Sequence, residues 1–171
     1  MTEQFASQDQ KFAWQKRYDV IVACVMAQFI CYIDRVNISV ASVAMQDSLG
    51  WSETTKGFVL SSFFIGYVLM QVPGGWLANK YVGRTVIMIA VLWWSLFTIL
   101  TPIAAFASFP LLIATRILMG LGEAALTPGT LNMFSRWIPT NERSRAVAIF
   151  SAAATMGTLA ALIATGWFLQ H

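Results

Sequence analysis

The sequence has few of the residues that solvate a protein surface or carry common side-chain chemistry. Asp, Glu, Lys and Arg together make up 11% of the 171 residues, whereas a soluble domain carries about 25%. Two cysteines, Cys24 and Cys31, are too few for a disulfide-rich scaffold or a multi-cysteine zinc site. The single histidine, His171, leaves little room for histidine-based catalysis. We therefore expect neither a soluble globule nor an enzyme, and we expect no cofactor and no metal site.

Long apolar runs take the place of the missing charges. Hydrophobic residues make up 57% of the chain and the mean hydropathy is +0.64, which excludes a disordered chain. A helix needs roughly 20 mostly apolar residues to cross a bilayer, and backbone groups in lipid must be satisfied within their own segment. Five stretches qualify: 20–44, 57–78, 85–107, 111–134 and 146–169. The sequence predicts an all-α membrane protein with five transmembrane helices, preceded by an amino-terminal tail at 1–18.

The basic residues lie mostly on one side of these spans. Eight lysines and arginines fall in the tail or in the connectors at 79–84 and 135–145: Lys11, Lys16, Arg17, Lys80, Arg84, Arg136, Arg143 and Arg145. Lys56 is alone on the opposite side. The positive-inside rule then predicts a cytoplasmic amino terminus. We expect a multi-pass protein of a bacterial inner membrane. Because these connectors explain the formal charge of +3, we expect the lipid bilayer as a partner and no nucleic acid.

Four charged residues remain inside the predicted spans: Asp34, Arg35, Arg116 and Glu123. Each costs at least about 2.5–3.5 kcal/mol near the bilayer centre unless it is paired or hydrated. Two positive and two negative charges can neutralise one another. Arg116 and Glu123 are seven residues apart and share one face of a helix. Gly120, Thr127 and Thr130 continue that face, as suits a helix that lines a cavity.

Two interpretations of these charges stay open. They can form a structural ion pair that locks the first and fourth spans together, or they can form a substrate or ion site. We favour the second, because ionisable residues inside membranes are functional by default. An arginine in such a cavity can bind the carboxylate of Asp34, of Glu123 or of an incoming anion. Protonating the acid frees the arginine for the substrate, so an anion and a proton enter together at constant net charge. This exchange of partners leads to the hypothesis that the protein is a symporter, which carries an anion and a proton in the same direction.

The connector after the second span resembles a signature of the major facilitator superfamily. Residues 75–84 read G-W-L-A-N-K-Y-V-G-R, against a family pattern of roughly G-x-L-a-D-r-x-G-R. The resemblance implies that Gly75, Asn79, Gly83 and Arg84 form a gating motif. Asn79 stands where the family usually has Asp, and it lacks the charge that is thought to latch the inward-closed state.

Further motifs resemble the anion:cation symporter branch, which is related to sialin, vesicular glutamate carriers and bacterial sugar-acid carriers. They are Y-I-D-R-V-N at 32–37, S-S-F-F with G-Y at 61–67, Q-V-P-G-G at 71–75, the stretch from Arg116 to Glu123 with Pro128, and R-W-I-P at 136–139. The resemblance implies substrate-binding roles for Tyr32, Arg35, Tyr67, Gln71 and Arg116. It implies proton coupling by Asp34 and Glu123.

The family fold has twelve spans in two six-helix halves, with the site between them. The resemblance therefore implies that residues 19–171 are a partial amino-terminal half, that the chain is an amino-terminal fragment, and that the missing second half is a partner. The implied cargo is a small organic anion such as a sugar acid or carboxylate, moved with H⁺ or Na⁺. Residues 151–155, S-A-A-A-T, lack the glutamine of some sugar-acid carriers, so a different substrate is open. The alternatives are a proton-coupled sugar or aromatic-acid carrier and a non-transporting membrane subunit.

Three smaller features predict structure. Gly157 and Ala161 are four apart, a spacing typical of close helix packing in membranes. Cys24 and Cys31 are expected to be small buried hydrophobic residues. Pro128 and Gly129 are expected to interrupt the fourth span.

Overall fold

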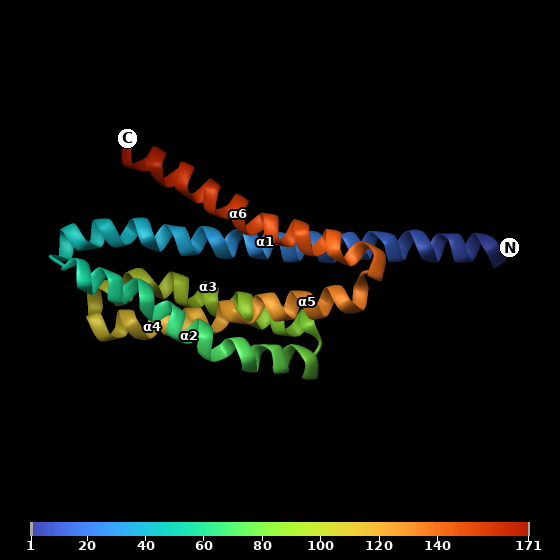
Figure 1. The fold of residues 1–171 in the computed structure, drawn as a ribbon, viewed down its shortest axis with the longest axis horizontal. Coiled ribbons are helices and arrows are strands. Elements are labelled where there is room, and N and C mark those ends of the chain that lie inside the picture. The colour runs from blue at the N-terminus through green and yellow to red at the C-terminus, as the bar shows by residue number, and fades with distance from the viewer. Residues whose placement is uncertain (1, 171) are drawn as a thin grey trace.

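The computed structural model describes the backbone from Thr2 to Gln170 and the side chains of residues 17–167, except those at 44, 47 and 49. The side chains of Lys11 and Lys16 and the whole of His171 lie outside this description. The described chain is helical, without strands, and runs as shown in Figure 1: α1 (Thr2–Leu49), α2 (Glu53–Lys80), α3 (Gly83–Ala107), α4 (Phe109–Ala124), α5 (Leu126–Trp137) and α6 (Thr140–Gln170).

The five predicted transmembrane helices are confirmed. In the described residues, five helical stretches are long and apolar enough to cross a membrane: Arg17–Val43, Glu53–Lys80, Gly83–Ala107, Phe109–Trp137 and Thr140–Trp167. The connectors are shorter than the sequence predicts. Most residues of the two segments expected as connectors, 45–56 and 135–145, are helical. A helix can continue past the end of its apolar run because its polar side chains reach water there.

The fourth span is broken, as predicted, but earlier than expected. Helix α4 ends at Ala124 and α5 begins at Leu126, whereas the sequence predicts the break at Pro128 and Gly129. Proline has no N–H to donate, and its ring clashes with the carbonyl of the residue four positions earlier, which here is Ala124. The helix therefore yields one turn before the proline itself.

Glycines let α4 approach two other helices closely. A Cβ built on Gly66 of α2 would collide with the carbonyl oxygen of Ile117 on α4, and one on Gly120 of α4 would collide with that of Phe63 on α2. A Cβ on Gly122 of α4 would meet the indole ring of Trp93 on α3 at 2.7 Å. Helix α4 thus lies against both α2 and α3, which brings the residues around Arg116 and Glu123 into the interior.

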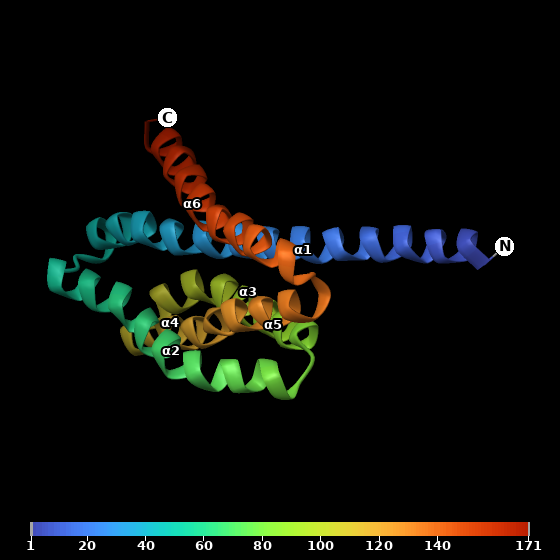
Figure 2. The same cartoon turned by 45° about the vertical axis from the view of Figure 1, so that its right-hand side comes forward.

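Helices α1 and α6 cross at a further glycine. A Cβ on Gly157 would lie 2.5 Å from the carbonyl oxygen of Phe29, and Ala161 is buried one turn further along α6. The packing role predicted for this pair is confirmed. Beyond the crossing, α6 diverges from α1 toward its carboxyl end (Figure 2).

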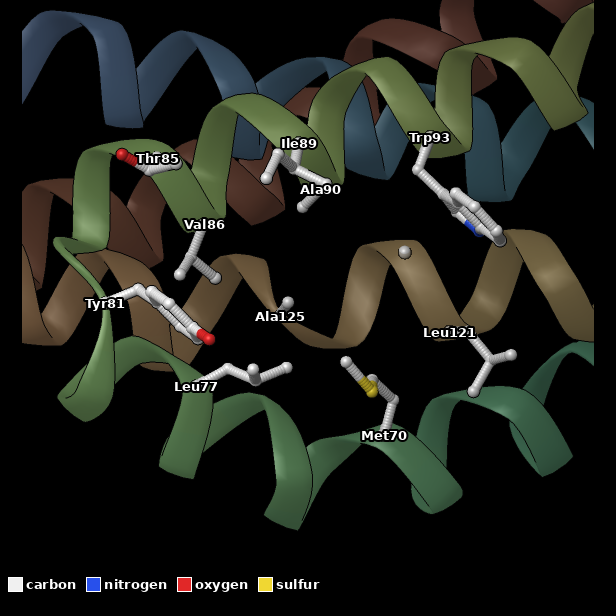
Figure 3. Close-up of a pocket in the computed structure, with 11 residues that line it drawn as sticks. Met70, Leu77, Tyr81, Thr85, Val86, Ile89, Ala90, Trp93, Leu121 and Ala125 are labelled. Carbon is white, nitrogen blue, oxygen red and sulfur yellow. The ribbon is translucent and has the colours of Figure 1, made fainter.

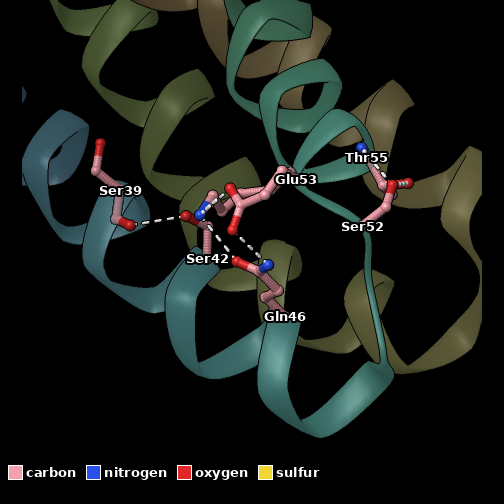
Figure 4. A network of polar contacts seen from close by, with 7 residues as sticks. Ser39, Ser42, Gln46, Ser52, Glu53 and Thr55 are labelled. Atoms are coloured by element: carbon pink, nitrogen blue, oxygen red, sulfur yellow. Dashed lines mark hydrogen bonds and ion pairs between the residues drawn. The ribbon is translucent and has the colours of Figure 1, made fainter.

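A polar network closes the end of the molecule where α1 turns into α2 (Figure 4). The Gln46 amide donates to Glu53 Oε1 at 2.7 Å, and Lys56 Nζ lies 2.7 Å from Glu53 Oε2. Lys56 also donates to the Gln46 side-chain oxygen at 2.8 Å. Ser52 caps α2 by accepting from the Thr55 N–H at 3.2 Å. The basic residue that is alone on this side of the spans is therefore paired locally.

Candidate functional site

An ion pair joins α1 to α4 in the interior of the helix bundle. Arg35 Nε donates to Glu123 Oε2 at 2.7 Å. The Glu123 side chain is fully buried, and 22% of the Arg35 side chain is exposed. This is the connection between the first and fourth spans that the charge count predicts, although the sequence cannot say which acid meets which base.

Glu123 uses its two carboxylate oxygens unequally. The Cys31 thiol donates to Oε2 at 3.1 Å, so this oxygen serves both Cys31 and Arg35. The other oxygen, Oε1, is buried and has no hydrogen-bond partner. A buried carboxylate oxygen without a donor is costly, and it offers a place where a proton or another cation can attach.

Aromatic rings surround the guanidinium group of Arg35. Its central carbon lies 4.9 Å from the ring centroid of Tyr32, 5.2 Å from that of Phe63 and 4.8 Å from that of Tyr67. Arginine interacts favourably with aromatic rings within about 6 Å. The close approach of α2 and α4 at Gly66 and Gly120 places Phe63 and Tyr67 there. Arg35 is thus held by one acid and three rings.

Arg116 has a different environment, although it lies on the same helix as Glu123. Only 3% of this residue is exposed, and its guanidinium carbon lies 5.5 Å from the ring centroid of Phe63. Its Nη1 donates to the Met119 sulfur at 3.1 Å, and its Nε has no hydrogen-bond partner. In the part of the chain that the structure describes, no carboxylate stands at ion-pair distance from Arg116. It is a buried cation held by a weak acceptor.

Asp34 completes the group of four charges. It is half-buried and lies within electrostatic range of both Glu123 and Arg116. The structure therefore brings together the four charged residues that the sequence places inside the spans, two in the first span and two in the fourth: Asp34, Arg35, Arg116 and Glu123. Gly120, on the face of the fourth span predicted to line a cavity, packs against α2 at the helix crossing.

Two of the three polar residues predicted to contact substrate lie at the same place. Tyr32 and Tyr67 are half-buried beside Arg35. Gln71 lies one turn beyond Tyr67 on α2 and is exposed, so the structure does not bury it with the charges.

The predicted gating motif lies at the opposite end of α2 from the Gln46 network and packs against α5. The Asn132 amide donates to the Asn79 side-chain oxygen at 2.9 Å. A Cβ on Gly83 would come within 2.9 Å of the Gly129 carbonyl oxygen, so no larger residue fits there. Gly75 lies beside Pro128, and Arg84 is exposed. The motif thus contacts α5, the second helix of the broken fourth span.

Sequence reasoning missed the roles of three residues. Cys31 was assigned only to packing, yet it lies one turn before Arg35 on the same face of α1. Phe63 lies one turn before Tyr67 and contacts both arginines. Asn132 is the partner of Asn79. The four-residue spacing is a signal that could have found Cys31 and Phe63, whereas nothing in the sequence links Asn132 to Asn79.

Comparison with known proteins gives a family match and a set of relatives. The family description "Major Facilitator Superfamily" matches residues 24–171. "Probable anion transporter 1, chloroplastic" of Oryza sativa subsp. japonica is 40% identical over 157 residues, which are 92% of this chain and 30% of that protein. "Ascorbate transporter, chloroplastic" of Arabidopsis thaliana is 41% identical, over 87% of this chain and 28% of that protein. "Sodium-dependent phosphate transport protein 1, chloroplastic" of Arabidopsis thaliana is 40% identical, over 91% and 30%.

Solved structures agree on the fold. A bacterial homologue of the human lysosomal transporter Spinster, in an inward-facing and unoccupied conformation, superposes with a TM-score of 0.80 and 27% identity. The match covers 88% of this chain and 31% of that one. The chain therefore spans about 30% of the length of the relatives that it matches.

Proposed function

The chain belongs to the Major Facilitator Superfamily, and from this premise we propose that it is part of a secondary active symporter for an organic anion. The family consists of multi-pass membrane transporters, and several relatives are named anion transporters. Because the chain spans about 30% of their length, we propose that further helices, including a second half, complete the carrier. We call the protein that includes these further helices the complete carrier.

The observation that carries the proposal is the buried guanidinium group of Arg116. An unpaired charge at this depth is expensive, and among the described residues no carboxylate at ion-pair distance offsets it. An anionic substrate offers the missing partner, because a guanidinium can bind a carboxylate through two parallel hydrogen bonds. We assign the substrate carboxylate to Arg116. Arg35, Tyr32 and Tyr67 form the adjacent wall, and Gln71 borders it from α2.

Proton coupling is proposed for the two acids. Glu123 Oε1 lacks a hydrogen-bond partner, and Asp34 lies within range of both Glu123 and Arg116. When either acid takes up a proton, the group of four charges becomes net positive by one, and an entering monoanion restores neutrality. Protonation of Glu123 also removes the negative charge that holds Arg35, so Arg35 becomes available to the substrate. Anion and proton therefore enter and leave together.

The named relatives leave two points of chemistry to experiment. One relative is named an ascorbate transporter, and ascorbate is a sugar-derived acid. This name supports our proposal that the cargo is a sugar acid or a related carboxylate. The sodium-dependent phosphate transport protein makes Na⁺ the second candidate for the coupling ion and phosphate a second class of anion. A proton-coupled sugar or aromatic-acid carrier and a non-transporting membrane subunit are the remaining alternatives.

We propose that the connector between α2 and α3 gates the carrier from the cytoplasmic side. The basic connectors predict that this side faces the cytoplasm. We propose a bacterial inner membrane, whereas several plant relatives are named chloroplastic. Gly75 and Asn79 lie near the end of α2, and Gly83 and Arg84 begin α3, so the motif flanks this connector. The hydrogen bond between Asn132 and Asn79 supports the proposal, since it replaces a charged latch by a neutral one.

Uptake into liposomes that contain the complete carrier tests the proposal. The assay compares inward H⁺ and Na⁺ gradients, with competition by sugar acids, mono- and dicarboxylates, glutamate, phosphate and neutral sugars. We expect a sugar acid or other carboxylate to compete and an H⁺ gradient to drive accumulation. Equal competition by neutral sugars, or indifference to the H⁺ gradient, would contradict the proposal. The 171-residue chain alone is expected to accumulate nothing, because it lacks the proposed second half of the site.

A further inference from the structure

A groove separate from the charged residues lies between α2 and α3. Both helices pack along α4 but hardly touch each other, so a groove of about 540 Å³ remains, with α4 and the start of α5 as its floor (Figure 3). Met70 and Leu77 line one wall, Val86 and Ile89 the other, and Ala125 the floor. The lining is almost wholly apolar. A polar solute therefore gains nothing by entering.

Trp93 closes the end of the groove that lies nearer the middle of α3, called its inner end. Its indole N–H donates to the carbonyl oxygen of Leu118 at 2.8 Å, so the polar atom of this side chain is already satisfied. The opposite end, called the outer end, lies at Tyr81 in the connector between α2 and α3. About ten residues of α3 separate the two ends, which corresponds to roughly 15 Å of helix. This is half of the bilayer core of about 30 Å, so the groove has the depth of one lipid leaflet.

Positive charge surrounds the outer end. Lys80 Nζ lies 4.6 Å from the ring centroid of Trp76 and 5.8 Å from that of Tyr81, which lines the groove. Arg84 is exposed on the first turn of α3, and residues 75–84 contain no acid. Basic residues at a membrane surface attract anionic lipid headgroups.

We propose that this groove binds an anionic phospholipid. One acyl chain lies between α2 and α3 as far as Trp93, and the headgroup phosphate sits between Lys80 and Arg84. The shape selects an acyl chain, and the charge at the outer end selects an anionic headgroup. Because the acyl chain lies against Ala125, where α4 gives way to α5, the lipid braces the break two residues from Glu123.

Native mass spectrometry of the purified chain tests this proposal. The chain is equilibrated in micelles with phosphatidylglycerol or with phosphatidylcholine of the same acyl chains, and the retained lipids are counted. We expect phosphatidylglycerol to be retained in preference. Lys80→Gln and Arg84→Gln should each reduce this preference roughly fivefold, whereas Arg145→Gln, an exposed charge at the same side, should leave it unchanged.

A second pair of variants tests the groove itself. Ile89→Trp fills it and should abolish retention of the bound lipid. Ile99→Trp changes an exposed position of the same helix that does not line the groove, and should have no effect. Circular dichroism checks that both variants keep their helical content. Equal retention of the two lipids by the unmodified chain, full retention by Ile89→Trp, or a lipid-free dimer in which a second copy covers the groove would each overturn the proposal.

Discussion

Helix α4 has two faces of opposite character. The face toward α1 and α2 carries Arg116 and Glu123, both buried, whereas the side over the gap between α2 and α3 carries Leu121 and Gly122, which line an apolar groove. The buried charges lie where helices enclose them, and no charged residue is among the described residues that line the groove. The two faces thus separate the proposed transport chemistry from the proposed contact with the bilayer.

Removal of the unpaired charge should have the largest effect on the charged face. In the complete carrier, Arg116→Gln deletes the proposed partner of the substrate carboxylate. Loss of one member of a desolvated charge pair costs about 2–5 kcal/mol, which is roughly 30-fold or more in affinity. Competition assays with a labelled carboxylate measure the loss. Arg145→Gln is the matched control, since Arg145 is exposed. An affinity unchanged in Arg116→Gln would mean that this arginine is only structural.

Removal of the proton site should separate two modes of transport. Glu123→Gln keeps the volume of the side chain but cannot carry the negative charge. Accumulation driven by an inward H⁺ gradient should fall at least tenfold, because proton and anion entry are uncoupled, while exchange of labelled for unlabelled anion persists. Asp34→Asn gives the same comparison for the second acid. Unchanged uptake driven by the H⁺ gradient in both variants would refute the coupling scheme.

The packing that creates the two faces is also open to test. Gly66→Ala forces a Cβ into the carbonyl of Ile117 and should lower the free energy of unfolding by about 1–3 kcal/mol, as overpacking does. Gly57→Ala on the same helix meets nothing within 4 Å, and should raise it by about 0.5–1 kcal/mol. Denaturation of the purified chain in detergent, followed by circular dichroism, measures both. Equal effects would show that α2 and α4 are not held at van der Waals contact.

The smallest expected effect concerns the carboxyl end of α2, beside the apolar groove. Asn79→Asp keeps the oxygen that accepts from Asn132 and should raise the free energy of unfolding by about 1 kcal/mol at most, because hydrogen bonds to charged groups are stronger. Asn79→Ala loses the bond and should lower it by about 0.5–1.5 kcal/mol. Thermal unfolding of the two variants separates them. Indistinguishable unfolding temperatures would show that the end of α2 does not rely on this contact with α5.

The spans could be predicted from the sequence because length and hydropathy are local properties. The apolar runs at 57–78 and 85–107 lie inside α2 and α3, and the helix ends differ by only a few residues. The break in the fourth span was predicted from Pro128, but its position was not, because the steric effect of a proline falls on the preceding turn.

The pairing inside the site could not be predicted, because it depends on how distant helices cross. Periodicity places Arg116 and Glu123 on one face of a helix, which suggests that they act together, yet Glu123 pairs with Arg35, 88 residues away. The crossing of α2 and α4 at Gly66 and Gly120 brings Phe63 beneath both arginines. The four-residue spacing points to Phe63 as a neighbour of Tyr67, but a single sequence contains no signal for its contacts with the arginines of other helices.

The most direct test of the central claim is to neutralise all four charges at once. The variant Asp34→Asn, Arg35→Gln, Arg116→Gln and Glu123→Gln leaves the net charge unchanged and leaves no buried ion unpaired, so we expect it to fold. Uptake of a labelled carboxylate is measured with the complete carrier in liposomes under an inward H⁺ gradient. We predict neither accumulation nor exchange. Accumulation at the level of the unmodified carrier would contradict the account, because the anion would then cross without the charges proposed to receive it.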